Sequence, residues 1–282
     1  MPSMSDYKKR RKQSMSDLTE KLDKLNSNQK SYEDDRLWKI ERDKAGNGYA
    51  VIRFLDAPEE ETAPWVRLWH HGFQGPGGWY IENSLTSIGQ KDPVSEHNTS
   101  LWNSGVEADK DIARQRKRKL NYYSNIYVVE DSLNSENEGK VFLFRYGKKI
   151  FEKITGVMNP EFQDETPINP FDLWEGANFK IKMRQVDGFP NYDKSEFTDI
   201  CPLAEDEKKL EEVWKSQYSL SEIVDEKNFK SYAELESRFN TVIAHEGNDF
   251  VGTIEESTED PVATGEKADE TLDYFKKLAE QE

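Results

Sequence analysis

The sequence has little of what disulfide-stabilised, metal-stabilised or membrane-embedded proteins need. Its 282 residues include a single cysteine, Cys201. One cysteine excludes an intramolecular disulfide framework and any zinc site built from several thiolates. No stretch approaches 18 consecutive apolar residues, and the cationic start lacks the apolar segment of a secretory signal. We therefore expect a soluble intracellular protein that does not interact with membranes.

Motifs of common catalytic sites are also missing. The sequence contains no P-loop, no G-x-S-x-G and no H-E-x-x-H. Cys201 precedes a proline and has no neighbouring base, so we interpret it as a structural thiol. A group of histidines and carboxylates within 28 positions fits no established zinc spacing (His70, His71, Asp92, Glu96 and His97). We predict that the protein is not an enzyme and has neither catalytic residues nor metal ligands.

What the sequence does contain is charge, distributed unevenly. The net charge is −16, but residues 203–282 alone carry 22 acidic and 9 basic residues, a net charge of −13. Residues 110–153 instead carry 11 basic and 6 acidic residues, a net charge of +5. Two basic runs stand out, at residues 8–12 and 114–119. A locally basic body with an acidic C-terminal part is compatible with a phosphate-binding surface, despite the anionic total.

Short apolar segments between turn residues predict a mainly β core. We expect strands over residues 49–55, 65–69, 79–81, 125–129, 140–146 and 178–186, and a short helix over 148–157. The last of these strands alternates apolar and cationic residues, which predicts one buried and one basic face. Residues 83–110 show little periodicity. Beyond Pro202 the sequence becomes helical and acidic, with Ser231 as the cap of an apolar stripe that begins at Tyr232.

These elements predict a mainly β fold with added helices, of the α+β class. Five or so short strands with a connecting helix favour a barrel of the OB type, although sandwiches and SH3-like barrels have similar patterns. We expect a basic arm and short helix over 1–30, and a core over 31–245 that includes a loop-rich subdomain at about 70–120. Residues 246–282 are expected to form an acidic disordered tail.

Cationic and aromatic residues adjoin each other at several points along the core. Single-stranded nucleic acids are held by cations at the phosphates and by aromatic rings under the bases. The sequence places such residues together four times: Lys119 with Tyr122 and Tyr123, Arg145 with Tyr146, Arg184 with Phe189 and Tyr192, and Arg53 with Phe54. Neighbours in a strand point to opposite faces, so at most one of Tyr122 and Tyr123 is expected to stack on a base.

Several blocks also follow the order of a known family: Ala45–Leu55, His71–Phe73, Trp79–Glu82, Lys117–Lys119, Asn125–Val129, Glu136–Phe142, Gly147–Ile150, Trp174–Phe179 and Gly188–Asp193. On these blocks the chain resembles the single-stranded DNA-binding (helix-destabilising) proteins of T-even-type bacteriophages. The resemblance covers residues 37–245 and is weaker in both tails.

The resemblance implies a non-enzymatic protein that coats single-stranded DNA during phage replication, recombination and repair in the host cell cytoplasm. It implies an OB-fold core, a zinc-bearing subdomain, and an acidic tail that recruits replication and recombination proteins. A basic arm and a similar internal run would govern cooperative assembly of the protein with itself. The residues of the arm motif are Lys8, Lys9, Arg10, Arg11, Lys12 and Ser14.

The predicted DNA-binding residues combine the basic–aromatic pattern with positions implied by the resemblance. They are Arg53, Trp102, Arg116, Lys117, Arg118, Lys119, Tyr123, Arg145, Tyr146, Phe189 and Tyr192. Two departures from the family pattern affect this set. Leu120 and Asn121 replace the hydroxyl residues of the internal run, and Trp102 takes the place of a tyrosine in a loop of different length.

The zinc site of the family is the main departure. The family uses one histidine and three cysteines, whereas this sequence has His71 with Ser84, Asp92 and Ser95 at those positions. Serine is a poor zinc ligand, and thiolates supply most of the affinity. We therefore predict no structural zinc and no other cofactor. Residues 70–110 would then be held by packing of tryptophans (Trp65, Trp69, Trp79 and Trp102) or be more mobile.

A second interpretation assigns the protein to another functional class. An acidic-tailed replication adaptor or scaffold, without direct DNA binding, would account for the net charge of −13 in residues 203–282. It would leave the basic–aromatic core unexplained. A metal-dependent nuclease ranks third, because no paired acid and base or two-metal site is evident.

Overall fold

The computed structural model describes residues 34–244. From residue 39 onward they belong to one compact unit, and residues 34–38 belong to another. The two-residue strand β1 (Leu37–Trp38) lies in residues 34–38 and so belongs to the other unit. The predicted arm and its helix (1–30) and the predicted acidic tail (246–282) lie outside the described residues.

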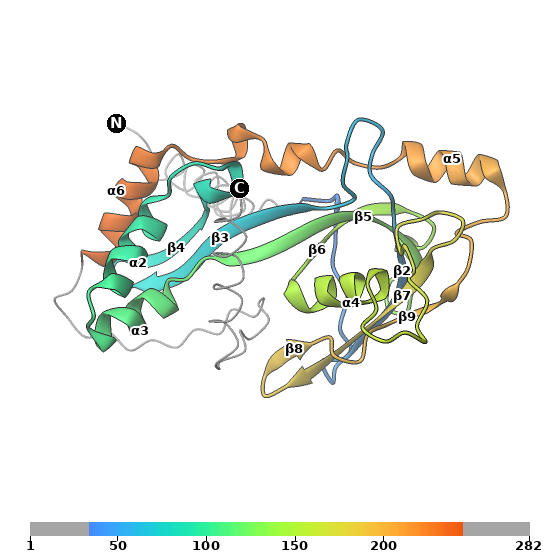
Figure 1. Ribbon diagram of the computed structural model, residues 1–282, viewed down its shortest axis with the longest axis horizontal. Helices are drawn as coiled ribbons and strands as arrows, with labels where there is room; N and C mark the ends of the chain where they lie inside the picture. The colour runs from blue at the N-terminus through green and yellow to red at the C-terminus, as the bar shows by residue number, and fades with distance from the viewer. Residues whose placement is uncertain (1–33, 245–282) are drawn as a thin grey trace, which may run out of the picture. The chain divides into compact units, whose positions relative to one another are not determined.

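Residues 39–244 combine a multi-stranded antiparallel sheet with five α-helices (Figure 1). The strands are β2 (Gly48–Phe54), β3 (Val66–Gly75), β4 (Gly78–Asn83), β5 (Lys119–Asp131), β6 (Val141–Tyr146), β7 (Ala177–Val186), β8 (Phe189–Asn191) and β9 (Glu196–Ile200). The α-helices are α2 (Pro93–Asn103), α3 (Glu107–Gln115), α4 (Lys148–Met158), α5 (Glu207–Lys215) and α6 (Tyr232–Ile243). The α+β class expected from the sequence is thereby confirmed.

Short 3₁₀ helices complete the described residues: η1 (Leu85–Ile88), η2 (Ser135–Asn137), η3 (Ser221–Val224) and η4 (Glu226–Asn228). Across residues 34–244, no helix combines the length and apolar character needed to cross a bilayer.

Strand β5 organises the sheet. It is 13 residues long, and it pairs with β3 through its N-terminal part, with β6 through its middle and with β2 through its C-terminal part. Strand β2 pairs in turn with β7, which also pairs with β8 and β9. Strand β3 pairs with β5 up to His70 and from His70 onward with β4. The long strands β3 and β5 thus connect the two ends of the sheet (Figure 1).

One core lies beneath β2, β6 and β7. Phe54 is fully buried, and its ring lies 5.6 Å from Tyr146, 5.8 Å from Phe171 and 5.8 Å from Phe179. Strand β7 alternates buried and partly exposed residues over Ala177–Met183. This confirms the predicted buried and basic faces of β7, because the intervening positions include the two lysines of that strand.

A second core lies between the β3–β4 hairpin and the helices that cover it. Phe73 and Tyr80 stack at 5.1 Å, and Phe239 of α6 contacts both rings edge-on at 6.3 and 6.1 Å. The turn of the hairpin lies against the C-terminal end of α6, where Gly77 N–H donates to the Val242 carbonyl at 2.8 Å. A Cβ at Gly77 would lie 2.2 Å from the Thr241 carbonyl oxygen, so only glycine fits there.

The expectation that the subdomain at about 70–120 is loop-rich is wrong, because α2 and α3 occupy most of residues 93–115. Helix α2 buries only Pro93 and Val94, so its sequence has no apolar stripe from which the helix could be predicted. Its start is instead defined by Asp92, whose carboxylate accepts from Ser95 N–H at 2.9 Å, and by proline at the first helical position.

The expected tryptophan packing of this segment is also wrong. Trp65 contacts Phe151 and Phe171 in the other core, each at 5.4 Å. Trp79 and Trp102 remain nearly half exposed. The segment is held instead by the Phe73–Tyr80–Phe239 core and by a polar cluster around Asp92, described below.

Candidate nucleic-acid interface

Several of the predicted residues share one face of the sheet. In the antiparallel pairs His70 lies opposite Lys119, and Tyr123 lies opposite Arg145. Directly paired residues point to the same face, and so do alternate residues along one strand. His70, Lys119, Asn121, Tyr123 and Arg145 therefore form one surface across β3, β5 and β6, which we call the cationic face. Asn121 Nδ2 lies 3.1 Å from His70 Nδ1, in agreement with this placement.

The electrostatics of the cationic face favour an anion. Burial, followed by the nearby charges of Arg145, Lys119 and His71, lowers the pKa of His70 to about 4. His70 is thus neutral at physiological pH and adds no charge to the cationic face. Burial also lowers the pKa of Lys119. Arg145 is exposed, whereas Tyr123 is buried.

The basic run 116–119 is divided between the two faces of the sheet. Arg118 lies on the opposite face from Lys119, and its guanidinium carbon sits 4.4 Å from the ring centroid of Trp69. Arg116 is half-buried, and its guanidinium carbon lies 5.7 Å from the Phe73 ring. Lys117 is exposed. Arg118 and Lys119 thus point to opposite faces, so the run does not form a single patch.

Arg53 and Tyr146 lie in the interior. Arg53 is fully buried, and it donates to Asn178 Oδ1 at 3.0 Å, to the Asp172 carbonyl at 3.2 Å and to the Cys201 carbonyl. Burial lowers the pKa of Arg53 and raises that of Tyr146, whose hydroxyl lies 2.9 Å from Ser124 Oγ. In this conformation neither a phosphate nor a base can reach these two side chains.

Both tyrosines of the 122–123 pair are buried. Tyr122 stacks on Phe151 of α4, with ring centroids 3.9 Å apart, and lies 5.7 Å from Tyr146. Tyr122 thus belongs to the core on the opposite side of the sheet from the cationic face. Tyr123 lies on the cationic face and is 9% exposed. In this conformation the ring of Tyr123, the member of the pair predicted to bind DNA, is not presented to a base.

The β7–β8 hairpin presents an exposed aromatic ring at its tip. Asp187 and Gly188 have φ values of 53° and 85°, as a two-residue type I′ turn requires. Phe189 follows this turn and is half exposed, whereas Tyr192 is partly buried. Arg184 on β7 is engaged by Asp193 through two contacts at 2.6 and 3.0 Å. This arrangement supports the prediction of an exposed ring in that loop.

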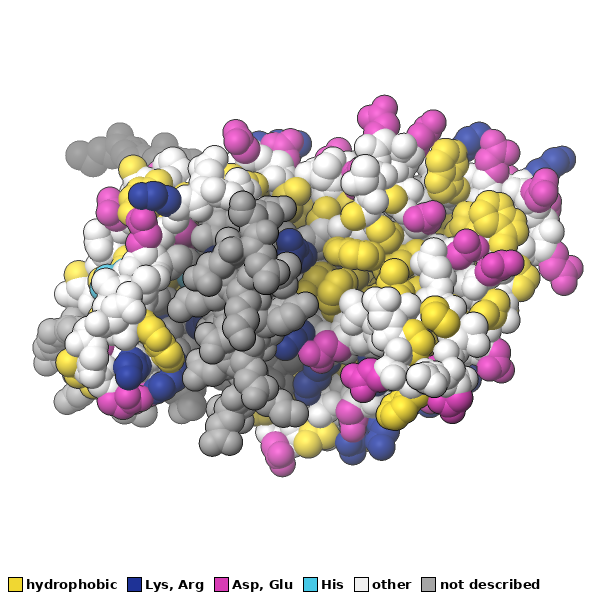
Figure 2. All heavy atoms as spheres, viewed as in Figure 1, with side chains coloured by type: hydrophobic (Ala, Val, Ile, Leu, Met, Phe, Trp, Pro, Cys, Tyr) yellow, Lys and Arg dark blue, Asp and Glu magenta, His cyan; other side chains and the backbone are white. Residues whose placement is uncertain are grey.

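Trp102 is exposed near the end of α2, with the guanidinium carbon of Arg114 lying 5.3 Å from its ring. Helix α3 supplies this arginine. On the side of the sheet shown in Figure 2, hydrophobic side chains gather over the region of β5, β6 and α4, with Lys and Arg side chains beside them. The cooperativity residues Lys8, Lys9, Arg10, Arg11, Lys12 and Ser14 lie outside the described residues.

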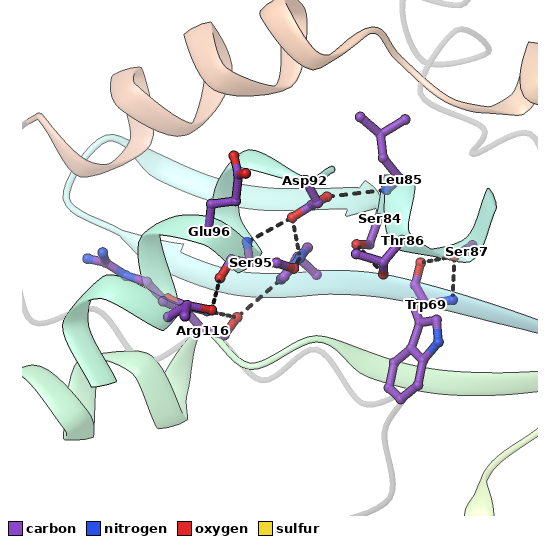
Figure 3. A network of polar contacts seen from close by, with 12 residues as sticks. Trp69, Ser84, Leu85, Thr86, Ser87, Asp92, Ser95, Glu96 and Arg116 are labelled. Atoms are coloured by element: carbon purple, nitrogen blue, oxygen red, sulfur yellow. Dashed lines mark hydrogen bonds and ion pairs between the residues drawn. The ribbon is translucent and has the colours of Figure 1, made fainter. Parts of the chain in front are cut away.

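The residues at which the resemblance implies zinc ligands form a polar cluster around Asp92 (Figure 3). His71, Ser84 and Asp92 are buried, and Ser95 is partly buried. His71 Nε2 lies 3.0 Å from Asp92 Oδ1, and Nδ1 donates to the Arg116 carbonyl at 3.1 Å. Asp92 also accepts from Leu85 N–H at 3.2 Å and caps α2. Burial acts to raise the pKa of Asp92, but hydrogen bonds from His71 and Ser95 N–H outweigh it and bring the pKa to about 2.

This arrangement does not fit a zinc ion. Both ring nitrogens of His71 are already engaged by oxygen atoms. Ser84 Oγ contacts Thr86 Oγ1 at 3.0 Å, and Ser95 Oγ lies 3.5 Å from His71. Within residues 34–244 no group of three or more His, Cys, Asp or Glu side chains is placed to hold a metal. Asp92 instead joins β3, η1 and α2 through hydrogen bonds.

Comparison with known proteins places the chain in a DNA-binding protein family. The family model described as "gp32 DNA binding protein like" matches residues 46–243. The single-stranded DNA-binding protein of Enterobacteria phage T4 is 40% identical over 241 residues, covering 83% of this chain and 79% of that protein. The protein of the same name from Enterobacteria phage T2 is 40% identical over 242 residues, with the same coverage.

The chain belongs to this gp32-like family, whose members are DNA-binding proteins and not enzymes. The resemblance found in the sequence is thereby confirmed. The single-stranded DNA-binding protein of Enterobacteria phage RB70 is a further relative, 37% identical over 119 residues, which are 98% of that protein.

Sequence reasoning overlooked part of the exposed surface of β4. Trp79 and Ile81 are 46% and 57% exposed, although the sequence predicts Trp79 to pack in this segment and Ile81 only to lie in a strand. Their alternation with buried Tyr80 is the signal that places both on one face.

Proposed function

We propose that the protein binds single-stranded DNA cooperatively and without sequence preference. The observation that carries this proposal is the cationic face, which gathers Lys119 and Arg145 on one sheet surface of a chain with net charge −16. Phosphates would be neutralised along this face. The exposed rings of Phe189 and Trp102 would stack on bases, because every base has an aromatic face.

Lack of sequence preference follows from these contacts. Lysine and arginine bind phosphates without reading a base, and stacking tolerates any base. Each phosphate neutralised on a single strand should contribute about 0.7 to the slope of log affinity against log salt concentration. Binding should therefore weaken steeply as salt rises.

The residues outside the described part of the chain complete the proposal. The basic arm, with its cations at residues 8–12, would bind the surface of an adjacent copy and so make binding cooperative. The acidic tail would compete with phosphates for the cationic face and recruit replication and recombination proteins once DNA displaces it. The protein would thus act in phage DNA replication, recombination and repair in the host cell cytoplasm.

Two structural assignments accompany this function. We assign the core built on β2, β5, β6, β7 and β9 to the OB type, in keeping with its antiparallel strands and connecting helix. We also propose that the protein uses no structural zinc. The His71–Asp92 contact supports this assignment, since it joins the elements that a metal would otherwise hold together.

A titration with labelled oligonucleotides tests the function. Fluorescence anisotropy of a short oligo(dT) and of a duplex of equal length would be measured at two salt concentrations. We expect tighter binding to the single strand and a clear loss of affinity at the higher salt. Equal binding to both, or none at low salt, would reject direct single-strand binding and favour the adaptor interpretation.

Cooperativity is tested separately by deletion of residues 1–13. The truncated protein should bind a short oligo(dT) as the full chain does, but should lose the steep saturation curve on poly(dT). Equal loss of affinity on both substrates would reject the role assigned to the arm.

A further inference from the structure

Strand β4 carries two large apolar side chains that the core does not use. Trp79 is 46% exposed and Ile81 is 57% exposed, whereas Tyr80 between them is fully buried. Tyr80 faces the helices, with its ring 6.1 Å from that of Phe239 in α6. Because side chains alternate along a strand, Trp79 and Ile81 point to the side of the sheet away from α6.

That side is the cationic face continued onto β4. Strand β3 pairs Asn83 with His70, Ile81 with Gly72 and Trp79 with Gln74. His70 is in turn paired with Lys119 on β5. The registers therefore place Trp79 and Ile81 on the same sheet surface as His70 and Lys119.

The separations suit one continuous surface. Paired strands lie about 4.8 Å apart, and each two-residue step along a strand adds about 6.6 Å. Ile81 is one such step from the row that contains Asn83, His70 and Lys119, and Trp79 is two steps from it. The aromatic and cationic groups are thus within the reach of a few consecutive nucleotides.

We propose that Trp79 is a base-stacking residue for single-stranded DNA, with Ile81 as an apolar contact beside it. This inference rests on the proposed function and extends its binding surface from β5 and β6 across β3 to β4. An aromatic ring exposed on the face of a sheet is a stacking platform, and the cations of the adjoining strands attract the backbone to it.

The charge of this surface favours a nucleic acid over a second copy of the protein. Lys119 and Arg145, which the strand registers place on the same sheet surface, make the adjoining surface positive. The positive surface is complementary to a chain of phosphates. An apolar contact between copies would not require cations on the same face.

The test compares Trp79→Ala and Trp79→Phe with Trp174→Ala. Trp174 is 59% exposed and lies outside every strand and helix, so it controls for the loss of an exposed indole. Affinity for a short labelled oligo(dT), which holds a single protein copy, is measured by anisotropy. Stacking contributes roughly 1–3 kcal/mol per base, so Trp79→Ala should weaken binding by about 5- to 150-fold. Trp79→Phe should retain most of the affinity, and Trp174→Ala should match the unsubstituted protein.

A second readout separates stacking from charge. Trp79 carries no charge, so the salt dependence of Trp79→Ala should keep the slope of the unsubstituted protein. Unchanged affinity in Trp79→Ala, while the unsubstituted protein binds, would overturn this inference and leave the proposed function intact. A defect seen only on poly(dT) would overturn it in favour of a contact between copies. Absence of binding by the unsubstituted protein would instead reject the proposed function.

Discussion

Replacing Asp92 by alanine should destabilise the protein far more than loss of an ordinary helix cap. Asp92 is 1% exposed, and its carboxylate contacts His71, Leu85 N–H and Ser95 N–H at 3.0, 3.2 and 2.9 Å. Alanine would remove all three contacts at once. It would leave the His71 ring and a backbone N–H without their acceptor in the interior of the subdomain.

The magnitude follows from the separate contributions. Loss of an N-cap costs about 1 kcal/mol, and each buried donor left without its acceptor costs about 1–3 kcal/mol. These contributions overlap because they share one side chain. We therefore expect Asp92→Ala to lower the free energy of unfolding by about 3–5 kcal/mol.

Urea unfolding followed by tryptophan fluorescence and far-UV circular dichroism measures this loss. Asp206→Ala is the matched control, because Asp206 caps α5 through Lys208 N–H at 3.1 Å but is exposed. The control should lose about 1 kcal/mol. If Asp92→Ala lost no more than Asp206→Ala, the assignment of Asp92 as the link between β3, η1 and α2 would be refuted.

Three further predictions concern acid, backbone packing and zinc. The pKa of Asp92 is about 2, below its ordinary value, so its stabilising contribution is present above about pH 3.9 and is lost as pH falls toward 2. The free energy of unfolding of Asp92→Asn should therefore depend less on pH in that window than the free energy of unfolding of the unsubstituted protein. Gly176→Ala should lower the free energy of unfolding in urea by about 1–3 kcal/mol, because the new Cβ would lie 2.2 Å from the Asp172 carbonyl and 2.3 Å from Arg53 Nη1. The control is Gly156→Ala in α4, whose new Cβ meets nothing within 4 Å, and this substitution should be neutral or stabilising. Adding EDTA or zinc should leave the Tm unchanged, and a chelator-induced drop in Tm would contradict the proposal that the protein uses no structural zinc.

The strands could be predicted because their signals are local. The predicted strand 49–55 matches β2 (Gly48–Phe54), and the predicted helix 148–157 matches α4 (Lys148–Met158). Ser231 caps α6 as expected, with Glu234 completing a capping box. In each case the periodicity or the cap lies within the element itself, so no distant contact is needed to recognise it.

Helix α2 and the interior position of Arg53 could not be predicted in this way. Helix α2 depends on Asp92, whose partner His71 is 21 residues away. Arg53 is compensated by groups at Asp172, Asn178 and Cys201, more than 100 residues along the chain. A buried arginine and an exposed one look alike in sequence until those acceptors are located.

In the candidate site, too, some features follow from local sequence and others depend on distant contacts. The cationic run at 114–119 was evident, but its separation into two faces depends on the register between β3 and β5. The exposure of Phe189 could be anticipated, because Asp187 and Gly188 suit a tight turn. The exposure of Trp79 could not, because an apolar strand residue normally indicates burial.

The central claim is that the cationic face binds the phosphate backbone, and the salt dependence of a double variant tests it most directly. Lys119→Ala combined with Arg145→Ala would be titrated with short oligo(dT) across a series of salt concentrations, with Lys208→Ala on exposed α5 as the control. Two lost phosphate contacts should reduce the log–log slope by about 1.4, while the control keeps the slope of the unsubstituted protein. A double variant with an unchanged slope would show that the phosphate backbone of the DNA binds outside the cationic face.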